Sequence, residues 1–195
     1  MNPQFDTLDV TAPLILEGEY NEAEAFGSAA WLWMHSRAHR DAPLHTLSSL
    51  LLPALKQRQF VLASENGKPV FYLSWANLNE EAERRYLRNP PVCMPQDDWA
   101  SGDRMWILDW VAPFGHSRTM SRLLKQRLFS NRCARALYHR RGHRGLRILT
   151  FHGIAVLPEE ARLWFDSNPV ALDQKMPLSA QATRGSAALV GGDHE

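Results

Sequence analysis

The chain has 195 residues, of which 45% are apolar and 22% charged, and a formal net charge of +1. This length and composition are typical of one folded domain and exclude a disordered chain. The two cysteines show no metal-ligand or disulfide spacing, and neither a secretory signal nor the roughly 18 apolar residues of a membrane span is present, so we expect a cytoplasmic protein.

The sequence predicts one domain at residues 21–170. Residues 1–20 lack a strong periodicity, and residues 171–195 are rich in Ala, Ser and Gly, so we expect both to be mobile tails. Residues 21–36 have apolar positions at helical spacing and acidic residues in the first turn, which predicts an amphipathic helix. His39 follows this helix in a loop.

A second helix fits residues 44–57, although Pro53 should kink it or divide it into two pieces. The apolar runs 60–63 and 70–75 then flank the dipeptide Asn66-Gly67. An Asn-Gly pair between such runs is the strongest short signal of a β-hairpin. An antiparallel hairpin is therefore predicted here.

The rest of the chain alternates further helices and strands. We expect helices at 79–87, 117–129 and 158–165, and strands at 104–111, 135–139 and 146–152, the last two pairing around the turn 141–145. The predicted fold class is a single α/β (α+β) domain, with helices around a mixed, mostly antiparallel sheet.

Positive charge is concentrated in one segment. Residues 116–147 carry ten lysine and arginine residues and no acidic residue. Such a segment offers a positive surface to an acidic partner, whether nucleic acid, anionic lipid, a phosphate-bearing cofactor or an acidic carrier protein. An exposed, solvated helix is the simpler alternative.

Asp109 stands inside an apolar strand. Burying an ionised carboxylate without a partner is costly. Asp109 therefore lies on the solvent face of the strand, pairs with a cation such as Arg104, or takes part in catalysis. The strand leads through Pro-Phe-Gly into a helix, and a helix start offers amides to a phosphate or an oxyanion. The sequence lacks the common nucleotide-binding and hydrolase motifs, and two histidines, His35 and His39, do not make a metal site.

Several segments between residues 27 and 153 occur together in an order typical of one family. They are Ala30-Trp-Leu-Trp-Met-His-Ser-Arg-Ala-His-Arg-Asp-Ala-Pro43, Leu52-Pro-Ala, Pro69-Val, Ser74-Trp-Ala-Asn-Leu78, Asp98-Trp-Ala-Ser-Gly-Asp-Arg104, Leu108-Asp-Trp-Val-Ala-Pro-Phe-Gly115 and Phe151-His-Gly. In these segments the chain resembles the toxin-activating lysine acyltransferases, which fatty-acylate RTX cytolysins.

The resemblance implies a fold similar to the Gcn5-related N-acyltransferases. It also implies acyl-acyl carrier protein as the acyl donor, internal lysines of an RTX protoxin as acceptors, and no permanently bound cofactor or metal. By the same resemblance His39 and Asp109 match the catalytic histidine and aspartate of the family. A homodimer is compatible with it.

The chemistry of thioester aminolysis suits these two residues. A free lysine has a pKa of about 10.4, so a base must remove its proton near neutral pH. Histidine can accept that proton and pass it to the leaving thiolate, and we assign this general-base role to His39. Asp109 either orients the imidazole or receives the proton first. No serine or cysteine occupies a known nucleophile motif, which favours direct transfer.

Substrate-binding roles are expected for a wider set of residues. Backbone amides that bind the oxyanion are expected near residues 74–77 or at the Phe114-Gly115 turn. The strand tryptophans either line an acyl channel or belong to the core. The arginines after Gly115 are expected to contact the carrier protein. The candidates are Ser74, Trp75, Asn77, Arg104, Trp106, Trp110, Phe114, Gly115, Arg118 and Arg122.

Three alternatives remain. The first is a basic nucleic-acid-binding module, although we expect no nucleic-acid partner. The second is an N-acyltransferase with another thioester donor or another amine acceptor. The third is a catalytically degenerate homologue that only binds toxin, because Leu50 replaces a functional asparagine of some family members.

Overall fold

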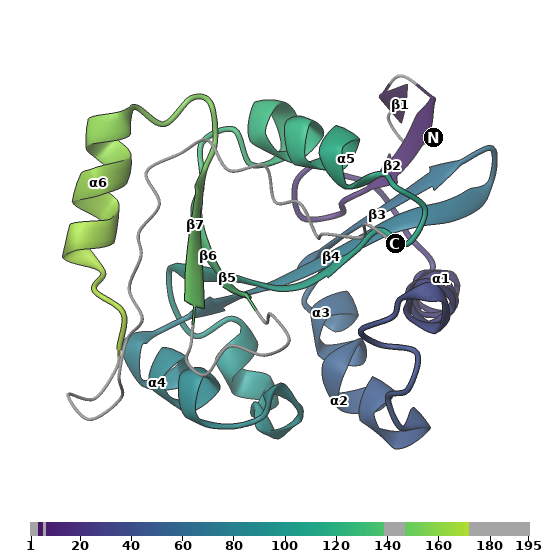
Figure 1. Ribbon diagram of the computed structural model, residues 1–195, viewed down its shortest axis with the longest axis horizontal. Helices are drawn as coiled ribbons and strands as arrows, with labels where there is room; N and C mark the ends of the chain where they lie inside the picture. The colour runs from purple at the N-terminus through teal and green to yellow at the C-terminus, as the bar shows by residue number, and fades with distance from the viewer. Residues whose placement is uncertain (1–3, 6, 139–146, 172–195) are drawn as a thin grey trace.

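The computed structural model describes residues 4–5, 7–138 and 147–171. Within these ranges seven strands form one sheet in the order β1-β2-β3-β4-β5-β6-β7 (Figure 1). All neighbours are antiparallel except β5 and β6, which are parallel. The strands are β1 (Gln4–Phe5), β2 (Leu8–Thr11), β3 (Phe60–Glu65), β4 (Lys68–Leu78), β5 (Arg104–Val111), β6 (Cys133–Tyr138) and β7 (Arg147–His152).

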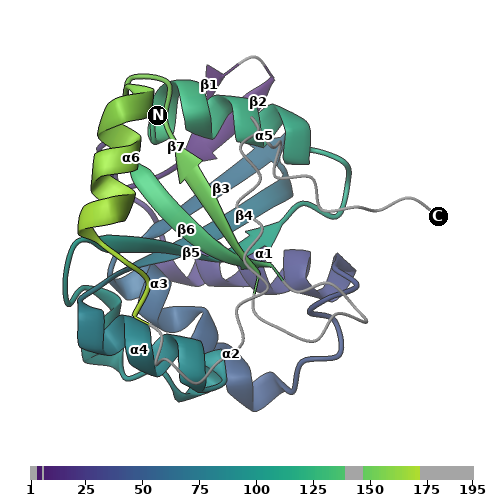
Figure 2. The same ribbon diagram turned by 60° about the vertical axis from the view of Figure 1, so that its left-hand side comes forward.

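Helices cover both faces of this sheet (Figure 1). α5 lies over one face, and α1 to α4 lie over the other, while α6 lies beside β6 and β7 (Figure 2). The helices are α1 (Glu22–His35), α2 (Leu47–Leu50), α3 (Leu52–Lys56), α4 (Glu80–Arg88), α5 (Ser117–Leu123) and α6 (Pro158–Ser167). The predicted class is confirmed: a mixed, mostly antiparallel sheet flanked by helices, consistent with a Gcn5-related N-acyltransferase-like fold.

The core is divided between the two faces of the sheet. On the α5 face, Met120 and Leu124 pack with strand residues such as Leu73. On the opposite face, the buried stripe of α1 packs against Tyr72 and Val111. Each layer therefore buries the apolar side of its helices, as the amphipathic pattern of residues 21–36 predicted.

α1 has a well-defined start. The side chain of Asn21 accepts hydrogen bonds from the amides of Ala23 (2.9 Å) and Glu24 (3.1 Å). Glu22 and Glu24 lie in the first turn, where negative charge stabilises the positive end of the helix dipole. The predicted helix at 21–36 is confirmed, and its end at His35 delivers the loop that contains His39.

The predicted helix at 44–57 is divided into short pieces. A 3-10 turn, η1 (Leu44–Thr46), precedes α2 and α3, and the chain breaks at Leu51 between the two α-helices. Pro53 occupies the first turn of α3, where its missing amide removes no helical hydrogen bond. The expectation that Pro53 marks a boundary is confirmed.

The hairpin of β3 and β4 is confirmed at the predicted dipeptide. Asn66 and Gly67 both have positive φ, 51° and 75°, as a two-residue type I′ turn requires. Later elements follow the predictions closely, except that α5 continues into a π-helical turn at Leu124–Leu128. The predicted turn at 141–145 lies outside the described residues.

Part of the segment expected as an N-terminal tail, residues 1–20, forms a strand. Leu8–Thr11 forms β2, which pairs with β3 in register from Leu8 opposite Glu65 to Thr11 opposite Leu62. Leu8 and Val10 are buried while Asp9 is exposed, a period-2 alternation that spans only four residues and is too short to predict a strand from the sequence. Residues 172–195 of the expected C-terminal tail lie outside the described residues.

A buried ionic cluster ties the segment after α6 to the sheet. Glu83 of α4 is fully buried and accepts hydrogen bonds from Arg104 and, at 2.7 Å, from Nε1 of Trp106. Arg104 and Arg135 also donate to backbone carbonyls of residues 168–169.

None of the helices within the described ranges has both the length and the apolar character that a membrane crossing requires.

Candidate active site

An irregularity in the pairing of β4 and β5 sets the direction of the Asp109 side chain. Ser74 lies opposite Asp109, but the next residue, Trp75, lies opposite Ile107, so Leu108 is an extra residue in β5. Side chains alternate along a strand, and one extra residue therefore moves Asp109 to the other face. Asp109 thus shares a face with Ser74 and not with Ile107, which packs on the α5 side.

Asp109 meets His39 on this face. Nε2 of His39 lies 3.5 Å from Oδ1 of Asp109. Oγ of Ser74 donates to Oδ2 of the same carboxylate at 2.9 Å. The side chains of His39 and Asp109 are 23% and 12% exposed, so the pair is accessible from solvent. The fold therefore brings the two predicted catalytic residues together and adds the predicted binding residue Ser74.

The loop after α1 fixes the His39 ring. The backbone amide of His39 donates to the carbonyl of Ser36 at 3.1 Å, and Nδ1 of the imidazole lies 2.9 Å from Oγ of the same serine. The imidazole also packs on the ring of Trp33, with 4.7 Å between centroids. Ser36 was missed at the sequence level, where a serine three residues before a loop histidine is the signal that could have found it.

Two arrangements of the neutral imidazole fit these contacts. If Ser36 donates to Nδ1, Nε2 carries the hydrogen and faces Asp109. If Nδ1 donates to Ser36, Nε2 presents a lone pair toward the carboxylate, and a cation between them contacts both groups. The 3.5 Å separation of Nε2 and Oδ1 exceeds an ordinary hydrogen bond and suits an ammonium group that approaches both atoms.

Tyr72 lies beside this group, two residues before Ser74 on the same face of β4. Its side chain is fully buried, and its hydroxyl has no hydrogen-bond partner within the described residues. An unsatisfied buried group of this kind costs about 1–3 kcal/mol. Burial, and then the charge of Asp109, raise the pKa of Tyr72 well above its ordinary value, so the hydroxyl stays protonated.

A cluster of aromatic rings joins the end of α1 to the loop between β5 and α5. The ring of Phe114 lies 5.5 Å from those of Trp31 and His35, and the last two lie 4.1 Å apart. Nζ of Lys68, at the start of β4, lies 4.4 Å from the Phe114 ring centroid and 5.6 Å from that of Trp31. These cation–π contacts connect the two segments that flank the imidazole and the carboxylate.

The three strand tryptophans occupy different environments. Trp75 and Trp106 are buried in the core, and Trp106 donates to the carboxylate of Glu83. Trp110 is half-buried, and its Nε1 donates to Oγ of Ser117 at 3.2 Å. Packing therefore encloses Trp75 and Trp106, while Trp110 lies next to Asp109 near the end of β5.

Two other predicted binding residues take part in structural contacts. The carbonyl of Asn77 accepts a hydrogen bond from the amide of Gly102 at 2.9 Å. Arg104 is buried and pairs with Glu83, not with Asp109. The basic side chain that faces the Asp109 carboxylate is thus the imidazole of His39.

Basic side chains occupy the exposed side of α5 and of the π-helical turn after it. Arg118, Arg122 and Arg127 are exposed, and Lys125 is half-buried. α5 begins just after Gly115, whose φ of 86° favours glycine. This basic surface lies on the opposite face of the sheet from α1 (Figure 1).

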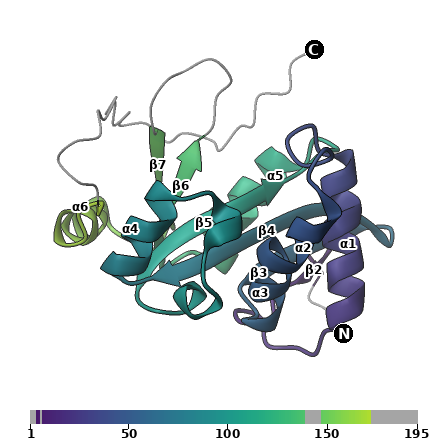
Figure 3. The same cartoon turned by 90° about the horizontal axis from the view of Figure 1, so that it is seen from below.

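The parallel pairing next to the site is short. β5 and β6 pair only at Trp106 with Arg135 and at Ile107 with Ala136 within the described residues. Beyond these pairs β6 and β7 turn away from the end of β5 (Figure 3). Asp109 therefore lies just past the point where the ladder ends.

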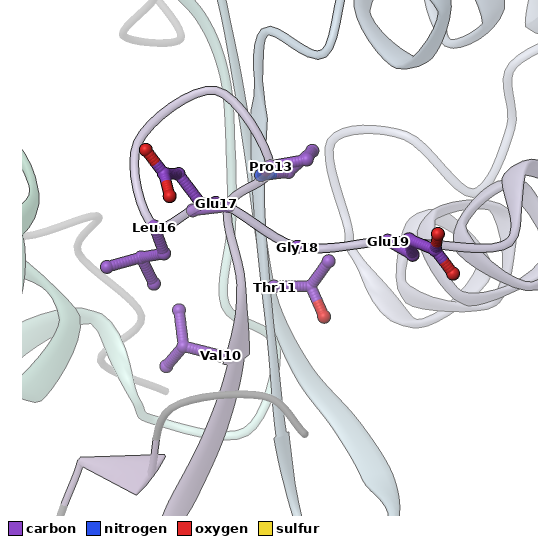
Figure 4. Close-up of a pocket in the computed structure, with 8 residues that line it drawn as sticks. Val10, Thr11, Pro13, Leu16, Glu17, Gly18 and Glu19 are labelled. Atoms are coloured by element: carbon purple, nitrogen blue, oxygen red, sulfur yellow. The ribbon is translucent and has the colours of Figure 1, made fainter.

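A separate hollow lies at the turn after β2 (Figure 4). Its lining contains none of the predicted site residues and consists of Val10, Thr11, Ala12, Pro13, Leu16, Glu17, Gly18 and Glu19. In the part of the chain that the structure describes, no group of three or more His, Cys, Asp and Glu side chains could hold a metal ion. The imidazole and carboxylate pair remains the candidate active site.

Comparison with known proteins connects this site to an activity. The family model of the RTX toxin acyltransferase family (HlyC) matches residues 18–152. The chain is 41% identical over 133 residues to the RTX-I toxin-activating lysine-acyltransferase ApxIC of Actinobacillus pleuropneumoniae, which covers 68% of this chain and 76% of that protein. It is 40% identical over 127 residues to the protein-lysine myristoyltransferase RtxC of Kingella kingae, covering 65% and 75% of the two chains.

A third relative gives the same picture. The leukotoxin-activating lysine-acyltransferase LtxC of Aggregatibacter actinomycetemcomitans is 38% identical over 133 residues, covering 68% of this chain and 78% of that protein. The matched region contains α1, the hairpin and β5, and so both His39 and Asp109. The chain therefore belongs to the RTX toxin acyltransferase family and is an acyltransferase.

Proposed function

We propose that this protein transfers a fatty acyl group from acyl-acyl carrier protein to internal lysines of an RTX protoxin and thereby activates it. His39 acts as the general base, and Asp109 attracts the acceptor ammonium and stabilises the imidazolium. The observation that carries the proposal is the solvent-accessible pair of Nε2 of His39 and Oδ1 of Asp109, 3.5 Å apart. The proposed donor also implies a cytoplasmic location.

The transfer is a direct aminolysis. The acceptor ammonium binds between His39 and Asp109 and loses a proton, after which its nitrogen attacks the thioester carbonyl carbon. The carbon–nitrogen bond forms, the tetrahedral intermediate collapses, and the carbon–sulfur bond breaks. The ammonium loses two protons in total: His39 passes one to the leaving thiolate, and the other goes to solvent.

Ser36 makes a second mechanism concrete. Its hydroxyl lies 2.9 Å from Nδ1 of His39, and Asp109 lies at the other nitrogen, which is the order of groups in a serine–histidine–aspartate triad. In that mechanism Ser36 would carry the acyl group before the lysine does. Direct transfer is favoured because Nδ1 then only has to donate one hydrogen bond to Oγ of Ser36 to hold the ring, and the lone pair of Nε2 faces the carboxylate that attracts the amine.

The basic surface of α5 supports an acidic donor protein. Arg118, Arg122 and Arg127 offer positive charge to solvent on the face opposite α1. The last paired residue of β5 toward β6 is Ile107, close to Asp109 in the strand, and this is where an extended acyl-phosphopantetheine arm would pass from the α5 face to the carboxylate. We propose that the carrier protein docks on α5 and delivers its thioester there.

The donor is tested with purified components. The protein is mixed with an RTX protoxin and with either acyl-acyl carrier protein or acyl-coenzyme A of the same chain length, and lysine acylation is measured by mass spectrometry. The proposal predicts rapid acylation from the carrier-protein donor only. Efficient acylation from the coenzyme A thioester alone would contradict it and support the alternative donor.

A further inference from the structure

The Tyr72 hydroxyl is the feature that the proposed mechanism leaves unexplained. Buried polar groups in native proteins are almost always hydrogen-bonded, and exceptions call for an explanation. Tyr72 is fully buried, and within the described residues its hydroxyl has no partner. It lies in the centre of the sheet, where Leu62 and Val111 flank it on the neighbouring strands.

Its position connects it to the carboxylate through one serine. Tyr72 and Ser74 are two residues apart on β4 and point to the same face. Ser74 donates to Oδ2 of Asp109 at 2.9 Å. The pKa of Tyr72 is raised by burial and then by the Asp109 charge, and the nearby Ser74 hydroxyl offsets part of that increase, so all three groups lie close together.

A serine hydroxyl has one hydrogen and two lone pairs. When the Ser74 hydrogen is directed at Asp109, its lone pairs remain free to accept a hydrogen bond. The protonated hydroxyl of Tyr72 can donate a hydrogen bond to one of these lone pairs. This hydrogen bond would keep the Ser74 hydrogen directed at the Asp109 carboxylate.

We propose that Tyr72 is a positioning residue for the reaction: its hydroxyl donates to Oγ of Ser74 when the acceptor ammonium engages Asp109, and so holds the carboxylate in line with His39 during transfer. The inference rests on the proposed roles of His39 and Asp109. The carboxylate must be held most firmly when the imidazolium forms beside it, so this hydrogen bond stabilises the transition state more than the bound acceptor and acts on kcat rather than on KM.

This role makes stability and activity respond in opposite directions to Tyr72→Phe. The variant keeps the ring and removes a hydroxyl that the free enzyme leaves unsatisfied, so the urea midpoint of unfolding should stay equal or rise. The kcat for lysine acylation should fall about tenfold, while the KM for the protoxin should change by less than about twofold. A tyrosine that only fills the core would give the same stability result with unchanged kcat.

The matched control is Tyr86→Phe. Tyr86 of α4 is also buried, and burial and Asp109 also raise its pKa, but it packs on Trp106 and lies on a different element from Ser74. Tyr86→Phe should leave kcat unchanged. An equal fall in both variants would show a general effect of removing a phenol near the site and would overturn the assignment to Tyr72.

The route through Ser74 is tested with a double-mutant cycle. Tyr72→Phe should reduce kcat in the wild-type background and cause almost no further loss in a Ser74→Ala background. Equal losses in both backgrounds would overturn the relay. The wild-type rate with each thioester donor tests the proposed function. The ratio of the kcat of Tyr72→Phe to that of the wild type is measured with whichever donor the enzyme uses. A wrong donor and a wrong role for Tyr72 are therefore distinguishable.

Discussion

Oγ of Ser36 lies 2.9 Å from Nδ1 of His39, so the imidazole is held from the side opposite Asp109. Ser36 is three residues before His39 in the turn that ends α1, and the backbone of this turn already links the two residues. The serine therefore has the geometry either of a group that positions the base or of a nucleophile that the base activates.

Ser36→Ala distinguishes these two roles. Direct aminolysis predicts that kcat falls about tenfold, because one hydrogen bond to the imidazole is lost, and that Ser36→Thr restores most of it. Steady-state acylation of a protoxin measures both variants. Complete loss of transfer in Ser36→Ala, together with an acyl group found on Ser36 in the acceptor-free enzyme, would contradict direct transfer.

Arg122→Glu tests the basic surface of α5. Arg122 is exposed, so reversing its charge should leave folding unchanged and weaken the encounter with an acidic carrier protein. We expect the KM for acyl-acyl carrier protein to rise more than kcat falls, and the wild-type rate at low donor concentration to decrease with added salt. Arg162→Glu, on exposed α6, is the matched control and should leave the donor KM unchanged. Equal donor KM values for Arg122→Glu and wild type would place the donor elsewhere.

Glu83→Gln tests the buried cluster behind the sheet. Removing this charge leaves Arg135 buried without its carboxylate partner and Arg104 with only the more distant carboxylate of Glu80, at 3.7 Å, so the free energy of unfolding should fall by about 3–5 kcal/mol. Urea denaturation followed by tryptophan fluorescence measures it. Glu81→Gln removes an exposed partner of Arg85 on the same helix and should have almost no effect. Similar stability of both variants would contradict the structural role of the cluster.

Glu65 gives a pH dependence with a defined sign. Hydrogen bonds from Thr7 and then His116 lower the pKa of Glu65 below its ordinary value of 4.5. A carboxylate with a lowered folded-state pKa contributes stability that is present above its unfolded-state pKa and is lost as the pH falls through the folded-state value. The free energy of unfolding of the wild type minus that of Glu65→Gln should therefore be constant near neutral pH. This difference should disappear as the pH falls below 4.5. A difference that widens on acidification would contradict this account.

Local patterns predicted most of the fold. The Asn66-Gly67 turn, the capped helix that begins after Asn21 and the strand at Arg104–Val111 each follow from residue type and spacing in one short segment. β2 was missed because its alternation spans only four residues and its burial depends on pairing with β3, which is distant in the chain.

The site was predictable only as far as its motifs. Family motifs pointed to His39 and Asp109, but the extra residue Leu108, which turns the carboxylate toward the imidazole, depends on the register with β4. The spacing of Ser36, three residues before His39, could have marked this serine, but its contact with Nδ1 depends on the loop geometry. Tyr72 has no sequence pattern that sets it apart from ordinary packing, because its position depends on the face of a buried strand.

The central claim is that His39 and Asp109 together acylate lysines of an RTX protoxin. Its most direct test is intact-mass spectrometry of the protoxin co-expressed with this protein, with His39→Ala or with Asp109→Ala. The account predicts fatty-acyl mass additions on lysine with the wild type and their loss with either variant. Undiminished acylation with His39→Ala, or no mass shift with the wild type when carrier protein and toxin are confirmed, would contradict it.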